Sequence, residues 1–215
     1  MSSVTIVDYG LGNLLSVSRA FEHCGATVTL TDSAKEIDSA ERLVLPGVGA
    51  CPDGMEGLRQ RGLIESIRNH ALSGRPFLGI CLGMQMMLEE SEEYGIHEGL
   101  GIIPGRVRAI PATDISGKAH RIPHIGWNPL VPSAGANWQR TPLQEVKPGS
   151  AMYFVHSFAA DPTLPANRLA DCIYGGHALA GVVIRGNAFG CQFHPEKSGE
   201  TGLKIIRSFA NWKAT

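Results

Sequence analysis

The sequence lacks any apolar run of the ~18 residues that a membrane-spanning helix needs, so we expect no transmembrane segment. Residues 1–9 also lack the basic start and the long apolar stretch of a signal peptide. Lysine and arginine together number 19 and the acidic residues 20, which leaves a net charge of -1. A large basic field for nucleic acid is therefore not expected either.

Cysteine pairing of the kind found in disulfide-rich or zinc-binding proteins is also missing. The sequence has five cysteines, an odd number at irregular spacing, and no CxxC pair occurs. We therefore expect reduced thiols in a cytoplasmic protein, with no metal site and no cofactor. The five cysteines are Cys24, Cys51, Cys81, Cys172 and Cys191.

The first half of the sequence alternates short apolar runs with stretches of helical periodicity. Helical spacing runs through residues 14–24 and 58–72, with a break in the second stretch near Gly62, and it returns at residues 84–88. The apolar runs predict strands at residues 4–7, 27–30, 42–45 and 76–80. Strands and helices in alternation imply parallel strand pairing with right-handed crossovers, which is an α/β fold.

The second half, beyond about residue 99, consists of short β-type runs separated by turns rich in proline and glycine. We expect these runs to extend the sheet and to add an antiparallel part; they are residues 106–110, 151–155, 179–184 and 188–193. Residues 110–143 hold five prolines and are predicted to form long loops. Residues 201–212 are predicted to form an amphipathic helix with Leu203, Ile206 and Phe209 facing inward. With 215 residues and no clear linker, residues 1–215 are expected to form a single domain.

Cys81 stands in the most informative segment. A short apolar strand runs into Gly79-Ile80-Cys81-Leu82-Gly83 and then into a helix, which is a thiol version of the nucleophile elbow. The tight turn would lift Cys81 out of the sheet and aim the amide of Leu82 at an oxyanion, and the helix amino terminus would favour a thiolate. On this pattern alone, a core cysteine beside two ordinary glycines is an equal alternative.

His194-Pro195-Glu196 is the second catalytic candidate. Pro195 favours extended backbone at His194, and residues two apart in an extended chain point the same way. We therefore expect the Glu196 carboxylate beside the His194 ring, completing a Cys-His-Glu arrangement with Cys81. A surface histidine and glutamate in a loop is the alternative reading. Four other histidines have no motif around them and are predicted to be surface or helix residues: His23, His70, His97 and His177.

Taken together, these motifs resemble the class I glutamine amidotransferases of the Cys-His-Glu type, and five segments resemble one subfamily. This subfamily is the glutaminase subunits of imidazole glycerol phosphate synthase, from histidine biosynthesis. The five segments are residues 8–14 (DYGLGNL), 45–49 (LPGVG), 123–128 (PHIGWN), 153–158 (YFVHSF) and 192–198 (QFHPEKS). They spread from the first strand to the last, so the resemblance covers nearly the whole chain. It implies a flavodoxin-like α/β fold with a mixed, mainly parallel sheet flanked by helices.

The resemblance also implies an activity, the hydrolysis of L-glutamine to glutamate and ammonia. Cys81 would attack the substrate, His194 would transfer protons and Glu196 would orient the histidine. The oxyanion hole is expected from Leu82 and from Val48 and Gly49, in a strand whose peptide reorients before its amide faces the oxyanion. From spacing alone, a simple strand-end turn at residues 46–49 is the favoured interpretation. The candidate substrate-binding residues are Gly49, Gln85, His156, Ser157 and Phe158.

Two of these substrate-binding candidates have a competing interpretation. The family usually carries an aromatic hydroxyl at the position of Phe158, and this sequence lacks it, so a polar role for the Phe158 side chain is in question. His156 is equally interpreted as a packed strand residue.

The resemblance further implies a partner, a cyclase subunit with a β/α barrel fold in a heterodimer. Ammonia would pass through the barrel to form imidazole glycerol phosphate and aminoimidazole carboxamide ribotide. Asn13, Tyr153, Lys197 and Ser198 are expected on the side of the partner, although Lys197 is equally an ordinary solvated lysine.

Three other functions stay open on the sequence alone. A paralogous glutaminase would supply ammonia to amino- or amidino-sugar synthesis for surface polysaccharide. A catalytically idle scaffold or regulatory subunit is disfavoured by intact Cys81, His194 and Glu196. A stand-alone thiol hydrolase is the weakest of the three, because such an enzyme lacks the subfamily segments.

Overall fold

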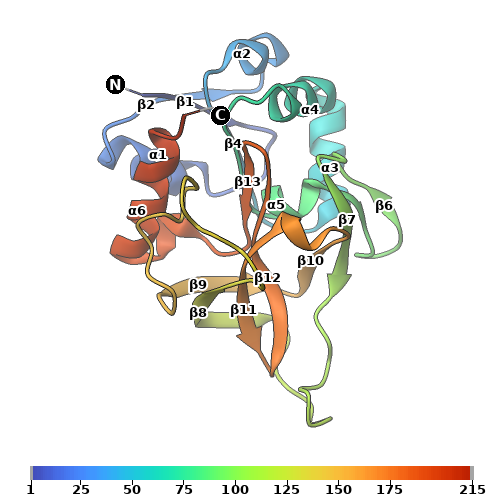
Figure 1. The fold of residues 1–215 in the computed structure, drawn as a ribbon. Coiled ribbons are helices and arrows are strands. Elements are labelled where there is room, and N and C mark those ends of the chain that lie inside the picture. Colours follow the sequence, from blue (N-terminus) through green and yellow to red (C-terminus); the bar gives the residue numbers. More distant parts are fainter. Residues whose placement is uncertain (1, 214–215) are drawn as a thin grey trace.

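A nine-stranded sheet forms the centre of the protein in the computed structural model, which describes residues 2–213 (Figure 1). Its strand order is β2-β1-β3-β4-β13-β12-β11-β8-β9, and the first five strands in this order run parallel. These strands are β1 (Ser3–Val7), β2 (Thr27–Thr31), β3 (Leu43–Gly47), β4 (Phe77–Cys81) and β13 (Ala188–Cys191). The α/β prediction is confirmed. β3 and β4 are buried along their whole length, as expected of near-continuous apolar strands in a parallel sheet.

The other half of the large sheet is antiparallel, as predicted. It consists of β12 (His177–Arg185), β11 (Arg168–Tyr174), β8 (His124–Pro132) and β9 (Ala151–His156). The prediction of long loops over residues 110–143 is wrong for its middle, where β8 is a nine-residue strand. Pro129 and Pro132 suit this strand because they occupy the last pairs with β9 and β11, where a missing N–H costs little.

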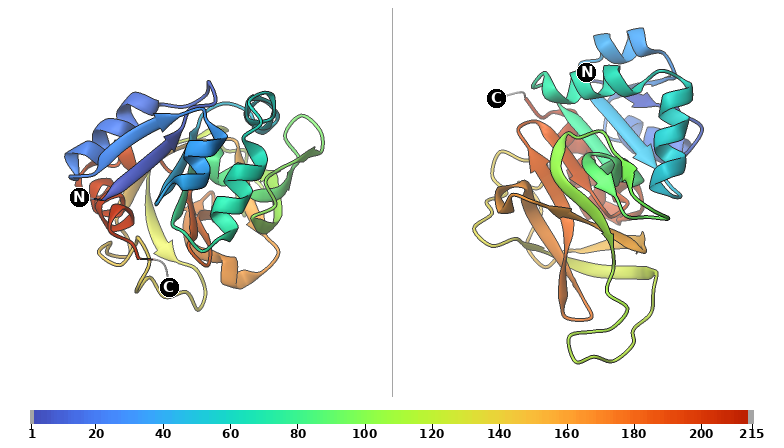
Figure 2. Two further views of the ribbon diagram at one scale, coloured as in Figure 1. Left: turned by 90° about the horizontal axis from the view of Figure 1, so that it is seen from above. Right: turned by 90° about the vertical axis from the view of Figure 1, so that its right-hand side faces the viewer.

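Helices cover both faces of the large sheet (Figure 2). α1 (Leu14–His23) and α6 (Gly199–Ala210) pack together on one face, where the rings of Phe21 and Phe209 meet edge to face at 6.1 Å. In α6, Ile206 and Phe209 are buried as predicted, and Leu203 is half-buried. A second hydrophobic core, separate from the one under α1 and α6, contains residues of four helices. They are α2 (Ala34–Ser39), α3 (Cys51–Gln60), α4 (Ile64–Leu72) and α5 (Leu82–Met86).

Three details of the predicted helices come out differently or more sharply. The break near Gly62 is confirmed, since this residue has φ +66 between α3 and α4. His70 lies in α4 but is fully buried, and its Nε2 lies 3.1 Å from the carbonyl oxygen of Pro76. The helix predicted over residues 84–88 begins earlier and ends at Met86, because Leu88 already starts a strand. Two short 3₁₀ turns are Pro165–Asn167 (η1) and Pro195–Lys197 (η2).

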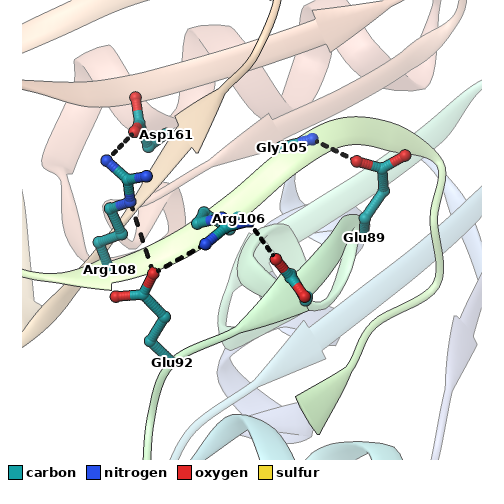
Figure 3. Close-up of polar contacts among 7 residues, drawn as sticks. Glu89, Glu92, Gly105, Arg106, Arg108 and Asp161 are labelled. Atoms are coloured by element: carbon teal, nitrogen blue, oxygen red, sulfur yellow. Dashed lines mark hydrogen bonds and ion pairs between the residues drawn. The ribbon is translucent and has the colours of Figure 1, made fainter. Parts of the chain in front are cut away.

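A second, four-stranded sheet packs beside α5 and carries an exposed charge ladder (Figure 3). Its strands, in sheet order, are β10 (Phe158–Pro162), β7 (Ile103–Ala109), β5 (Leu88–Ser91) and β6 (His97–Glu98). Arg106 bridges to Glu90 at 2.6 Å and Arg108 bridges to Asp161 at 3.0 Å, which links β7 to both of its neighbours. These side chains are partly exposed, so each pair contributes little alone.

The turn between β4 and α5 is packed too closely for side chains at its two glycines. A Cβ added at Gly83 would collide with the backbone carbonyl oxygen of Leu45 in β3, so only glycine fits there. A Cβ at Gly79 would lie 2.7 Å from the carbonyl oxygen of Gly83. The two glycines predicted to relieve crowding are therefore required, and they let α5 start directly against the sheet.

We expect Gly83→Ala to lower the free energy of unfolding by about 3 kcal/mol, because the new methyl group meets backbone that cannot move aside. Urea denaturation measures the change. Gly186→Ala is the control: Gly186 has φ +56 and open space around its Cβ position, so the cost there is limited to about 1 kcal/mol of backbone strain. Equal losses in the two variants would contradict the packing argument.

Candidate active site

Cys81 stands at the carboxyl end of β4, level with Gly47 of β3 and at the edge of a cavity of about 380 Å³. Its backbone has φ 54 and ψ -108, a conformation that a non-glycine residue rarely adopts and that costs ~1–3 kcal/mol. Its side chain is 7% exposed and lines the cavity, so a small substrate reaches the sulfur. Strained backbone at a cavity is the geometry that the elbow pattern predicts.

His194 and Glu196 lie together as predicted, but by a different backbone route. His194 Nδ1 lies 2.9 Å from Glu196 Oε1, and both side chains are nearly or fully buried. His194 is extended, with φ -97 and ψ 98, as Pro195 requires. The chain then enters η2 and does not stay extended, because the amide of Lys197 bonds back to the carbonyl of His194. A tight turn, and not strand alternation, brings the carboxylate back to the ring.

The environment of His194 favours its charged form. Burial alone would lower the pKa of the ring, but the hydrogen bonds with Cys81 and Glu196 outweigh it and raise the pKa to about 9. The ring nitrogen that does not face Glu196 is thus the one that faces the thiol. At neutral pH the arrangement holds an imidazolium beside the sulfur, which is the partner that a thiolate needs.

The other buried cysteines are poor competitors for the role of nucleophile. Burial raises the pKa of Cys51 to about 11 and that of Cys172 to about 12. Burial also raises the pKa of Cys191 well above its ordinary value. All five cysteines are free thiols, so no disulfide restrains the site.

The end of β3 borders the same cavity and is held at one point. The hydroxyl of Tyr9 donates to the carbonyl of Pro46 at 2.8 Å, which fixes the peptide before Gly47. Val48 is 41% exposed and Gly49 has φ +98 with open space around it. The two residues expected in the oxyanion hole therefore lie beyond the anchored peptide, next to the cavity.

The residues expected to bind substrate all line the cavity, but their side chains are not equally available. The Gln85 amide nitrogen already donates to the carbonyl of Phe158 at 2.9 Å. His156 uses Nδ1 on that same carbonyl at 2.8 Å and Nε2 on His124 at 2.9 Å. The Phe158 carbonyl is thus occupied by two protein donors, and His156 fits the packed-residue interpretation. Ser157 lies between them in the cavity wall.

His156 belongs to a buried group with His124 and Cys172, whose ligand-type atoms lie within 4.8 Å of one another. The ring nitrogens that face each other are joined by the 2.9 Å hydrogen bond. Burial lowers the pKa of His156 to about 4 and raises that of the Cys172 thiol, so both groups are held neutral. The arrangement is a packed neutral pair of histidines, of which His124 stacks on Phe154, with no thiolate ready for a metal.

Glu93 is a cavity residue that the sequence analysis missed. It is 9% exposed, and its Oε2 accepts a hydrogen bond from the Cys51 amide at 2.8 Å, at the amino terminus of α3. It also lines the cavity that contains Cys81. In sequence it closes the acidic run 89–93, which looks like a solvated surface, so only the inward turn of this one side chain distinguishes it.

The residues expected on the partner side differ in their exposure. Lys197 is exposed at the cavity rim, while Asn13 is half-buried at the start of α1. Tyr153 is half-buried, and its ring lies 5.9 Å from that of exposed Trp127. Ser198 is buried, and its hydroxyl donates to the His194 carbonyl and accepts from the Tyr153 amide. Ser198 therefore ties the turn formed by residues 194–197 to β9.

Among residues 2–213, no helix is both long and apolar enough to cross a membrane. The family model described as "Glutamine amidotransferase class-I" matches residues 5–211 of the chain.

Two curated relatives illustrate the sequence similarity. Imidazole glycerol phosphate synthase subunit HisH 1 of Legionella pneumophila (strain Lens) is 57% identical over 210 residues, covering 97% of this chain and 99% of the relative. Subunit HisH of Caldanaerobacter subterraneus subsp. tengcongensis is 45% identical and covers 96% of each chain.

Solved structures share the fold at lower identity. PurLQS from Thermotoga maritima gives a TM-score of 0.72 at 20% identity over 99% of each chain. A crystal structure of a glutamine amidotransferase gives a TM-score of 0.70 at 18% identity, over 96% of this chain and 98% of the other.

We expect the His194 ring to titrate near pH 9 in the wild-type chain and at a clearly lower pH in Glu196→Gln, because a neutral amide no longer favours the imidazolium. NMR of the ring carbon-bound protons measures the titration. The pairing stabilises the folded state fully below the ordinary histidine pKa of 6.5, and this contribution is lost as pH rises through about 9.

Glu200→Gln is the control for this titration, since Glu200 is exposed in the first turn of α6. A wild-type ring that titrates below pH 6.5 would contradict the assignment of the ion pair.

Proposed function

The chain belongs to the class I glutamine amidotransferase family, and on this basis we propose that it is the glutaminase subunit of an imidazole glycerol phosphate synthase. It hydrolyses L-glutamine to glutamate and ammonia and supplies the ammonia to histidine biosynthesis. The observation that carries the proposal is that Cys81 and His194 line one cavity, with Glu196 in contact with His194. Matches along almost the full chain support treating residues 1–215 as one catalytic domain. The proposal includes a cytoplasmic location.

In the proposed reaction, the Cys81 thiolate attacks the side-chain amide carbonyl of glutamine. Negative charge passes to the amide oxygen, which the backbone amides of Leu82 and of the Val48–Gly49 segment stabilise. The His194 imidazolium gives its proton to the leaving nitrogen, so ammonia departs and a γ-glutamyl thioester remains. The neutral ring then accepts a proton from water, which attacks the thioester and releases glutamate. Glu196 keeps the ring oriented through both steps.

The charge of Glu93 suits the other end of the substrate. Free glutamine carries an α-ammonium group, and Glu93 places a carboxylate in the cavity wall. Its Oε1 is not used by the Cys51 amide and is the oxygen available to a ligand. Gln85 similarly spends its amide nitrogen inside the protein and keeps its carbonyl oxygen for the substrate amide.

The proposed partner is a cyclase subunit with a β/α barrel fold, in a heterodimer. Exposed apolar side chains next to the turn of residues 194–197 support a docking face there. On β8, Ile125 is 46% exposed and Trp127 is 56% exposed. Lys197 and Tyr153 lie beside this face, and Asn13 is part of the same proposal. Ser198 contributes indirectly, by holding the turn that presents Lys197.

The unanchored end of β3 supports control by the partner. Tyr9 holds the peptide before Gly47, while Val48 is 41% exposed and the Cβ position of Gly49 faces open space. A peptide rotation here completes the oxyanion hole without disturbing the sheet, because Gly49 tolerates backbone angles that other residues resist. The isolated subunit is therefore expected to have almost no glutaminase activity.

We expect the purified chain to release glutamate rapidly only when mixed with a cognate cyclase subunit, and Cys81→Ala to abolish this release. Coupled assay of glutamate with and without the partner measures both effects. Glutamate release that survives Cys81→Ala would sink the assignment of the nucleophile. Strong glutaminase activity without any partner would count against control by the β3 end. Complementation of a histidine auxotroph by this chain distinguishes a role in histidine biosynthesis from one in sugar amidation.

For the reconstituted pair, we expect Glu93→Gln to raise the KM for glutamine about tenfold with a smaller change in kcat, since one charge-assisted contact to the substrate is lost. The new amide side chain at position 93 still accepts a hydrogen bond from the Cys51 amide, so the amino terminus of α3 keeps its acceptor. Glu92→Gln is the matched control, because Glu92 lies on the charge ladder with Arg106 and Arg108. An unchanged KM in Glu93→Gln would remove Glu93 from the substrate site.

A further inference from the structure

Gln192 lies beside the nucleophile because of the strand register. β13 pairs with β4 in parallel, and the last pair is Cys191 with Ile80. The next residue along the chain is Cys81, the last of β4, on one side and Gln192, directly after β13, on the other. The Gln192 side chain is fully buried, so its amide has only protein groups and the sulfur around it.

A chain of hydrogen bonds fixes which end of the Gln192 amide faces the sulfur. The carbonyl of Phe158 only accepts, so the Gln85 nitrogen must be the group that faces it, at 2.9 Å. The same nitrogen gives its second hydrogen to Gln192 Oε1 at 3.0 Å. The Gln192 nitrogen is therefore turned toward Cys81 Sγ, at 3.7 Å.

The starting point of this chain is itself secured. The Phe158 carbonyl also accepts from His156 Nδ1 at 2.8 Å, which occupies both of its lone pairs. His156 is held neutral, with its pKa lowered to about 4 by burial, so its Nε2 accepts from His124. Reversing the Gln192 amide would bring two donor nitrogens together, and reversing Gln85 as well would set its oxygen against the Phe158 carbonyl.

We propose that Gln192 is a further catalytic residue, whose Nε2–H donates to the Cys81 sulfur and stabilises its thiolate form. The inference rests on the proposed function, since it takes Cys81 as the nucleophile. The sulfur then has two donors, the charged His194 ring and the neutral Gln192 amide. When the sulfur attacks, its charge passes to the substrate oxygen, and it returns to the sulfur when the thioester is hydrolysed. The amide therefore acts on the supply of thiolate before the attack and on the departure of the thiolate at the end.

This role predicts how the effect of Gln192 on the reactivity of Cys81 depends on pH. A donor that stabilises the thiolate matters where the thiol would otherwise be protonated, and it gives no advantage at a pH where every thiol is ionised. A purely structural role for Gln192 would lower reactivity by a similar factor at every pH.

The test is alkylation of Cys81 by iodoacetamide in the full-length chain, followed by mass spectrometry of the peptide that contains Cys81. We expect Gln192→Met, which keeps the length but has no donor, to react about tenfold more slowly at pH 6 and no more slowly at pH 10. Gln144→Met is the matched control, because Gln144 is exposed and bonds to Ser208 on α6. Rates equal to wild type at pH 6, or equally reduced at both pH values, would overturn the proposal.

Gln192→Glu keeps the test decisive if Gln192→Met does not fold. It preserves shape but replaces the donor by a carboxylate oxygen, so alkylation at neutral pH must slow at least as much as in Gln192→Met. An unchanged rate in this variant would also overturn the proposal. Failure of the proposed function shows up separately, as glutamate release by Cys81→Ala in the reconstituted pair.

Discussion

The catalytic geometry depends on one steric constraint, the contact of the β4–α5 turn with the backbone of β3. Because Gly83 lies against the Leu45 carbonyl, the helix starts with no gap after the strand. Cys81 must then absorb the change of direction in its own φ and ψ. The parallel register sets Gly47 level with Cys81 and Cys191 level with Ile80, and Gln192 follows directly after Cys191. The residues around the Cys81 sulfur therefore come from distant parts of the sequence.

Two kinds of interaction meet at that sulfur from different sides. On one side is a charged pair, in which buried Glu196 favours the imidazolium of His194. On the other is a neutral chain of amides and rings that ends on the carbonyl of Phe158. A second full charge in the chain would be costly in such a buried place. Amides supply direction without that cost, while the charge is limited to the pair that contains the proposed proton carrier, His194.

The sequence was sufficient for the residues whose chemistry is encoded locally. The glycines around Cys81 and the proline after His194 restrict the backbone directly, so the elbow and the histidine–glutamate contact were predictable, although the second forms through a turn and not an extended chain. Glu93 and Gln192 were missed because their roles arise from strand register and from the turn of one side chain out of an acidic run. β8 was missed because prolines at the ends of ladders look like loop residues.

The left-handed backbone of Cys81 has a consequence for how this position evolves. A glycine there would adopt φ 54 without strain, so replacement of the nucleophile by glycine is expected to make the fold more stable. Selection for the reaction therefore favours cysteine at this position, while selection for stability favours glycine. A lineage that no longer needs the reaction should lose the cysteine early, and the residue found at this one position then records whether the reaction is still under selection.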